Sequence, residues 1–145
     1  MIAIDTNILI YAHRAENSFH TAANQAILDL INQGKPCGIP IGCVHEFLAV
    51  TTNPKVFLHP TPSQHALGQI QAWLDAPSIR LLHSGLSHFK ILSNLINKGH
   101  IFGGKMHDAR IAATCIENGV SLLWTADRDF SQFTHALKTF NPLIR

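Results

Sequence analysis

Apolar residues fall into two alternating patterns along the chain: short continuous runs, and longer segments in which they recur at helical spacing. Residues 2–4 form an apolar run that ends at Asp5, which predicts a buried strand. Over residues 19–32, apolar side chains recur every three or four positions and the pattern stops at Gly34, which predicts a helix and its end. The two patterns continue to alternate toward the C-terminus.

The same patterns assign the rest of the chain. Further strands are predicted at residues 37–39, 79–83 and 122–125, and 138–140 is a candidate fifth strand. Further helices are predicted at residues 6–12, 40–53, 63–76, 86–97 and 105–118, the last two closed by Gly99 and Gly119. Residues 55–62 and 103–104 are predicted loops.

Short strands separated by helices favour parallel pairing, with helices on both faces of one sheet. We therefore expect one α/β domain over residues 1–145, a three-layer α/β/α sandwich around a mainly parallel sheet of four to five short strands. Sites in such sheets form outside the carboxyl ends of the strands. Asp5 and Asp127 each lie just past the carboxyl end of a predicted strand, which is the first indication of where a site forms.

The composition narrows the function class. Charged residues are only 14%, against about 25% in ordinary soluble domains, so we expect another chain to cover part of the surface. The formal net charge of +2 permits a nucleic-acid partner without requiring one. No apolar stretch approaches the roughly 20 residues of a membrane span, and the N-terminus lacks the basic region of a signal peptide.

The three cysteines also exclude some classes. Cys37, Cys43 and Cys115 are an odd number with no C-x-x-C pair, which argues against a disulfide framework or a thiolate zinc site. Free cysteines indicate a reducing, cytoplasmic location.

Two further acids occupy unusual positions. Glu46 and Asp108 each lie on the small or apolar side of their predicted helices. The neighbours at spacings of three and four are Gly42, Cys43, Ala49 and Val50 for Glu46, and Ile111, Ala112 and Cys115 for Asp108. Because an unpaired buried charge is costly, we expect both acids to face inward and to share a cation.

Each acid has a structural alternative when taken singly. Asp5 can cap the first helix, Asp108 can complement a helix N-terminus, Asp127 and Asp129 can form a turn, and Glu46 can pair with an arginine. Together they favour a site for Mg²⁺ or Mn²⁺, which take oxygen ligands. Such an ion lowers the pKa of a bound water and neutralises charge on a phosphate, so the chemistry expected is hydrolysis by a metal-activated water.

Four segments around these acids carry a family resemblance. They are Asp5-Thr6-Asn7, Val44-His45-Glu46-Phe47-Leu48, His107-Asp108-Ala109-Arg110-Ile111-Ala112-Ala113 and Thr125-Ala126-Asp127-Arg128-Asp129-Phe130. In this order and at these spacings the chain resembles the PIN-domain family, and more narrowly the VapC-type toxins of bacterial toxin–antitoxin pairs. The resemblance runs from Met1 to about Pro142.

The resemblance implies an α/β/α fold, endoribonuclease activity that depends on Mg²⁺ or Mn²⁺, a neutralising antitoxin protein, and frequent homodimers. It assigns catalysis and metal binding to Asp5, Glu46, Asp108 and Asp127, with Asp129 as a fifth metal ligand. Asn7 and Thr125 are expected to support these ligands. The cations that could contact RNA phosphates are Arg14, Lys105, Arg110 and Arg128.

The sequence also contains partial matches to other classes of protein. Residues 99–105 read G-x-x-x-x-G-K, the start of a P-loop, but Met106 follows and a helix precedes, so no nucleotide cofactor is expected. A haloacid-dehalogenase-like phosphotransferase would need an acid where Asn7 stands. The ten histidines give no helical zinc motif, and no aromatic-rich RNA-stacking motif is present. A housekeeping RNA-processing nuclease of the same fold and a non-catalytic binding module remain as alternative functions.

Overall fold

The computed structural model describes residues 1–144 and is built on one five-stranded sheet. The strands are β1 (Ile2–Ile4), β2 (Cys37–Pro40), β3 (Ile79–Leu82), β4 (Leu122–Trp124) and β5 (Lys138–Phe140). Their order across the sheet is β3-β2-β1-β4-β5, and every neighbouring pair is parallel. The predicted α/β class and parallel sheet are confirmed, and the candidate fifth strand is present.

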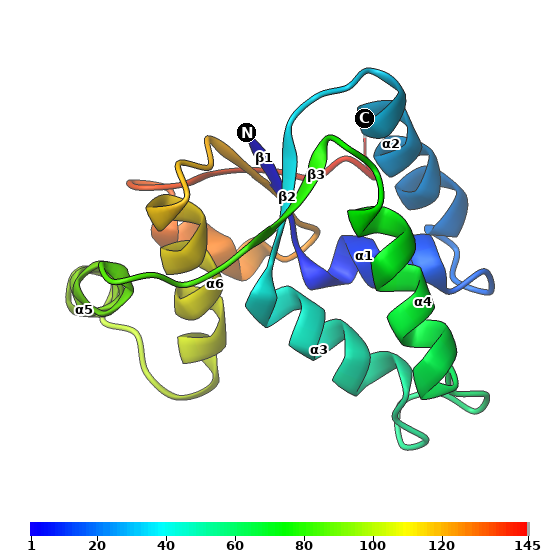
Figure 1. Ribbon diagram of the computed structural model, residues 1–145. Coiled ribbons are helices and arrows are strands. Elements are labelled where there is room, and N and C mark those ends of the chain that lie inside the picture. Colours follow the sequence, from blue (N-terminus) through cyan, green and yellow to red (C-terminus); the bar gives the residue numbers. More distant parts are fainter. Residues whose placement is uncertain (145) are drawn as a thin grey trace.

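Six α-helices and two short 3₁₀ helices connect the strands (Figure 1). They are α1 (Thr6–His13), α2 (His20–Asn32), α3 (Ile41–Thr51), α4 (Ser63–Leu74), α5 (His88–Gly99), η1 (Gly103–Lys105), α6 (Met106–Glu117) and η2 (Arg128–Phe133). In Figure 1, α1 to α4 lie on one side of the sheet, and α5 and α6 lie on the other. Right-handed crossovers produce this division, because the chain moves from β1 outward to β3 and then crosses back to β4 and β5.

The direction of winding changes between β1 and β4, two strands that lie side by side. Ile4 pairs with Trp124 at their carboxyl ends, and the Asp5 backbone N–H donates to the Trp124 carbonyl at 2.9 Å. Beyond this point α1 and η2 leave the two strands. A change in winding direction opens a crevice at the carboxyl edge of a parallel sheet, where ligands bind in folds of this kind.

The core packs on both faces of the central strands. Ala3, Ile4 and Leu123 are fully buried in β1 and β4. Phe47 of α3 and Phe130 of η2 are also fully buried. The sequence did not predict η2, because its apolar residues extend over too few positions to establish a helical period.

Some predicted boundaries are wrong by a few residues, most clearly around α5. This helix begins at His88 rather than Leu86, and its left-handed closing residue is His100 (φ 51°) rather than Gly99. The reason is Ile101, which is buried and whose backbone N–H donates back to the Ile96 carbonyl at 3.2 Å. For Ile101 to be buried, the chain must reverse direction at His100, one residue after Gly99.

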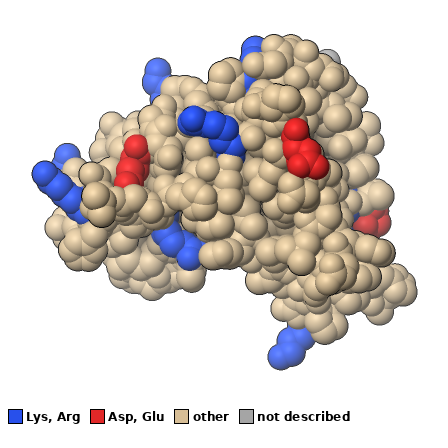
Figure 2. All heavy atoms as spheres, in the orientation of Figure 1, with Lys and Arg blue, Asp and Glu red and all other residues tan. Residues whose placement is uncertain are grey.

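The surface carries few charges. Figure 2 shows a face on which lysines, arginines and acids are scattered among uncharged side chains, in keeping with the 14% charged residues of the sequence. Within residues 1–144, no helix combines the length and apolar character needed to cross a membrane. Cys37, Cys43 and Cys115 are buried and free.

Candidate functional site

Asp5 is held rigidly at the carboxyl end of β1. Its side chain is 5% exposed and accepts four hydrogen bonds. Oδ1 accepts from the Thr6 backbone N–H at 2.8 Å and from the Cys43 thiol at 3.6 Å, while Oδ2 accepts from the Thr125 hydroxyl at 2.8 Å and the Asn7 amide at 3.1 Å. Asp5 therefore has a fixed orientation, and it also caps α1 as one structural alternative predicted.

Asn7 and Thr125 connect Asp5 to the segment that follows β4. The Asn7 Oδ1 accepts from the Ala126 backbone N–H at 3.0 Å, and the Thr125 hydroxyl accepts from the Asp127 backbone N–H at 3.0 Å. Each side chain thus contacts Asp5 and also fixes the backbone leading to Asp127. Through these hydrogen bonds both side chains fix the position of Asp5 relative to the backbone before Asp127.

Three other carboxylates converge beside Asp5. Asp108 lies in the first turn of α6, Asp127 follows β4, and Asp129 lies in the first turn of η2. One oxygen from each lies within 4.8 Å of the others, and these three residues are called the acidic cluster below. Within residues 1–144, no lysine, arginine or histidine forms an ion pair with any of them. Unneutralised oxygen ligands at this spacing suit a hard divalent cation.

The position predicted for Glu46 is wrong in one respect. Glu46 is exposed, because α3 packs into the core through other positions, such as Phe47. Gly42 lies on the same side of α3 as Glu46, but its small size does not indicate that this side is buried in the core. A Cβ atom there would lie 2.7 Å from Ile111 Cδ1 and 3.1 Å from Arg110 Nε, so glycine permits the close approach of α3 and α6. Glu46 faces the gap between these helices and not the core.

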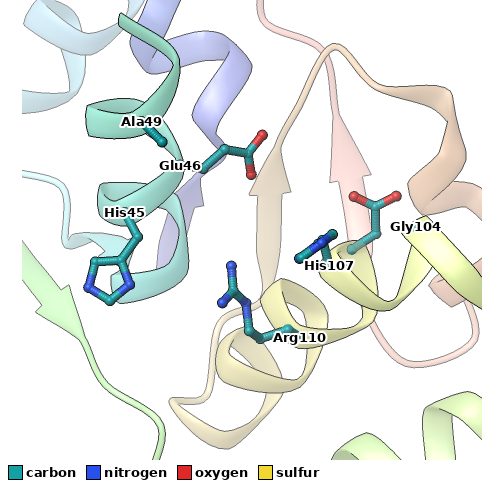
Figure 3. Close-up of a pocket in the computed structure, with 7 residues that line it drawn as sticks. His45, Glu46, Ala49, Gly104, His107 and Arg110 are labelled. Carbon is teal, nitrogen blue, oxygen red and sulfur yellow. The ribbon is translucent and has the colours of Figure 1, made fainter. Parts of the chain in front are cut away.

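A pocket of about 470 Å³ separates α3 from α6. Its lining residues are His45, Glu46, Ala49, Gly104, His107, Asp108 and Arg110. In Figure 3, the Glu46 side chain extends from α3 toward α6, and the Arg110 guanidinium lies between the two helices. Arg110 Nε is buried and has no hydrogen-bond partner within residues 1–144. The pocket therefore offers carboxylates on both walls and a cation between them.

The carboxylates of the site interact electrostatically. Burial raises the pKa of Asp5 from 3.8 to about 6, against the lowering effect of the hydrogen bonds from Thr125 and Thr6, and the charge of Glu46 raises it further. The pKa of Asp108 is also raised to about 6. Burial is the largest cause, and the negative charges of Asp127, Asp5, Asp129 and Glu46 raise this pKa further. The neighbouring carboxylates thus make ionisation of Asp5 and Asp108 less favourable, and a bound cation would have the opposite effect.

The predicted phosphate-contact residues divide into two groups. Arg110 and Lys105 line pockets that include Asp108, and Arg128 is exposed directly after Asp127. Arg14 lies instead at the far end of α1 from Asp5. It pairs with Glu16 at 2.6 Å and stacks 4.1 Å above the Phe57 ring. Arg14 therefore lies apart from the acidic cluster, and its contact with RNA stays a prediction.

Sequence reasoning missed a second pocket beside Asp108. It has a volume of about 420 Å³ and is lined by His100, Phe102, Gly103, Gly104, Lys105, Asp108, Asp129 and Gln132. Phe102 follows Ile101 and precedes two glycines in the sequence, and this short apolar pair belongs to no periodic pattern that would identify it. A lone aromatic in a glycine-rich segment was the only available signal.

Comparisons with known proteins agree with this architecture. The PIN domain family profile matches residues 2–136. Ribonuclease VapC43 of Mycobacterium tuberculosis is 35% identical, in an alignment that covers 99% of this chain and 96% of the relative. Among solved structures, VapBC2 of Rickettsia felis, bound to a DNA fragment from its promoter, shares the fold with a TM-score of 0.67 at 18% identity, covering 97% of this chain and 98% of that one.

A second solved structure is VapC20 of Mycobacterium tuberculosis, described as a toxin that cleaves the sarcin–ricin loop. It superposes with a TM-score of 0.66 at 15% identity, covering 90% of this chain and 93% of that one. At such identities the solved structures show the fold alone, whereas the family profile and VapC43 extend over nearly the whole chain. The chain therefore belongs to the PIN-domain family and, within it, to the VapC group.

Proposed function

We propose that this protein is a divalent-metal-dependent endoribonuclease and the toxin of a toxin–antitoxin pair. The observation that carries the proposal is the acidic cluster, three carboxylates within 4.8 Å of one another with no cationic partner in residues 1–144, next to the anchored Asp5. The 35% identity to a ribonuclease over nearly the full length supports RNA as the substrate class.

The donor set fits Mg²⁺ or Mn²⁺. Asp108, Asp127 and Asp129 supply oxygen ligands only, and Asp5 and Glu46 are the further carboxylates that would hold the ion or a second one. Hard cations prefer such ligands, whereas zinc sites usually include cysteine or histidine. When bound, the ion lowers the pKa of a water and neutralises negative charge that develops on a phosphate.

The protein's own groups would position the substrate. Arg110 lines the pocket between α3 and α6, where its guanidinium can donate to a phosphate. Lys105 lines the second pocket beside Asp108 and can contact a neighbouring phosphate of the RNA. Thr125 and Asn7 donate hydrogen bonds to Asp5 Oδ2, which fixes the orientation of this carboxylate. The expected products carry a 5′-phosphate and a 3′-hydroxyl.

The toxin assignment also predicts two protein contacts. We expect a cognate antitoxin to place a cationic or extended segment against the acidic cluster, because clustered carboxylates attract a guanidinium. We also expect a homodimer, since exposed apolar residues such as Val56, Leu58 and Leu86 accompany the low charge content. Light scattering on the purified protein measures the oligomeric state, and a stable monomer would contradict the dimer.

The test of the proposed function is RNA cleavage by purified protein, with and without EDTA, beside an Asp127→Asn control purified in the same way. Cleavage is expected with Mg²⁺ or Mn²⁺ only, and the control should be nearly inactive. Equal cleavage in EDTA would contradict the metal requirement. Expression of the toxin alone should stop growth and co-expression of an antitoxin should restore it, whereas a housekeeping nuclease would not have this effect.

A further inference from the structure

The second pocket beside the acidic cluster has a composition that the metal site does not explain. It shares Asp108 and Asp129 with the cluster, and its remaining wall holds Phe102, His100, Lys105 and Gln132 among others. Phe102 is 79% exposed. An exposed phenylalanine is unremarkable alone, but this one lines a pocket together with two carboxylates of the acidic cluster.

The backbone holds Phe102 in this position. Ile101 is 5% exposed and anchors the segment to the core. Phe102 is extended (φ −152°, ψ 160°), so its side chain leaves the backbone on the side opposite to that of Ile101. His100 and Gly103 have positive φ values of 51° and 63°, so the chain changes direction on both sides of Ile101 and Phe102. For a histidine this conformation is uncommon and energetically unfavourable.

The side chains of the pocket have the chemistry that binds unpaired nucleotides. Single-stranded RNA is recognised by bases that stack on aromatic or histidine rings, by polar groups that contact base edges, and by cations that contact phosphates. Phe102 and His100 supply the rings, and Lys105 supplies the cation. Gln132 donates one N–H to the Asp129 carbonyl at 3.3 Å and retains an amide oxygen as an acceptor.

We propose that this pocket binds the unpaired base of a nucleotide adjacent to the scissile phosphate, with the base stacked on Phe102. The inference rests on the proposed RNA cleavage and adds the site that selects the RNA. Because the pocket shares Asp108 and Asp129 with the metal site, a base held there places the neighbouring phosphate at the acidic cluster.

Binding of fluorescently labelled single-stranded RNA of random sequence tests the pocket without relying on catalysis. All variants carry Asp127→Asn to prevent cleavage. Phe102→Ala should weaken RNA binding roughly 5- to 150-fold, the loss expected from one base–aromatic stack. Phe102→Trp should retain binding, and Phe102→Leu, apolar but not aromatic, should bind as weakly as the alanine variant.

The chain offers a matched control. Phe89 on α5 is also 79% exposed but lines neither pocket next to Asp108, so Phe89→Ala should leave RNA binding unchanged. Phe102→Trp gives a second readout, because the two native tryptophans, Trp73 and Trp124, are buried. Its exposed indole fluorescence should be quenched when RNA is added.

The outcomes separate this inference from the proposed function. If the parent cuts RNA but Phe102→Ala binds RNA as tightly as its background, the base pocket is overturned and the nuclease stands. If Phe102→Ala binds RNA normally but no longer forms the dimer or binds the antitoxin, Phe102 belongs to a protein interface. That result would also overturn the inference. If the parent neither cuts nor binds RNA, both proposals are wrong.

Discussion

Asp5 and the acidic cluster lie at the same edge of the sheet, but the protein holds them in different ways. Asp5 is buried, and its two oxygens accept four hydrogen bonds from surrounding groups. In the acidic cluster, Asp127 accepts one hydrogen bond, from the Asp129 backbone N–H at 2.8 Å, and the side chains are half-buried or exposed. The fold thus fixes one carboxylate through its own contacts and leaves three others with oxygens available for a ligand.

The difference has an energetic counterpart. Replacing a residue of the Asp5 network removes native hydrogen bonds and should destabilise the protein, whether or not a metal is present. Replacing a residue of the acidic cluster removes mutual repulsion and should affect stability mainly through the metal.

Asp108→Asn should lower RNA cleavage by orders of magnitude. The substitution keeps the shape of the side chain while removing one charge from the cluster, and Asp108 accepts no side-chain hydrogen bond in residues 1–144 that the change would disturb. Initial cleavage rates with saturating Mg²⁺ measure the effect. An active Asp108→Asn enzyme would show that this carboxylate acts only as a favourable charge at the start of α6.

Thr125→Val should destabilise the protein by about 1–3 kcal/mol, because it leaves buried groups of the Asp5 network without a partner. The hydroxyl donates to Asp5 at 2.8 Å and accepts from the Asp127 backbone N–H at 3.0 Å. Denaturant unfolding compares this variant with Thr125→Ser, which keeps the hydroxyl and should remain close to the parent. Equal losses in both variants would place the effect in packing and not in the hydrogen bonds.

Gly42→Ala tests whether close approach of α3 and α6 sets the width of the pocket. The new Cβ would meet Ile111 Cδ1 at 2.7 Å, so the helices must move apart at a cost of about 1 kcal/mol or more, with a moderate loss of cleavage. Gly68→Ala on α4 is the control, since nothing lies within 4 Å of its added Cβ. That change should be neutral or slightly stabilising. Similar behaviour of the two variants would contradict the role of Gly42.

The pH dependence of stability should report the raised pKa of Asp108. Without metal, the folded state holds the Asp108 proton up to about pH 6, whereas the unfolded state loses it near 3.8. The folded state therefore binds more protons in this window, and the contribution of Asp108 to stability falls as the pH rises. The stability of Asp108→Asn relative to the parent should increase between these pH values, by about 1 kcal/mol once solvent screening is considered. A constant difference between pH 4 and pH 7 would contradict the shift.

Much of the fold follows from local patterns. Buried parallel strands appear as short apolar runs, and surface helices show their period, so five strands and six helices were located to within a few residues. The exceptions have local causes. The six residues of η2 are too few to show a period, and the end of α5 depends on where Ile101 reaches the core.

The site was predictable only in part. Strand ends place Asp5 and Asp127 correctly because parallel strands share one carboxyl edge. The face that Glu46 occupies could not be derived, since helical spacing shows which residues lie together but not which neighbouring helix approaches them. The small residue Gly42 indicated close helix packing and not burial of the acid. Phe102 gave no periodic signal, because its exposure depends on the burial of Ile101.

Thermal unfolding of the parent and of Asp108→Asn, each with EDTA and with Mg²⁺, tests most directly whether the acidic cluster binds metal. In EDTA, Asp108→Asn should unfold at the same temperature as the parent or higher, because it relieves repulsion among the carboxylates. Mg²⁺ should raise the melting temperature of the parent, since it binds the folded state, and should raise that of the variant much less. A variant that melts below the parent in EDTA and responds to Mg²⁺ as strongly as the parent would contradict the metal site.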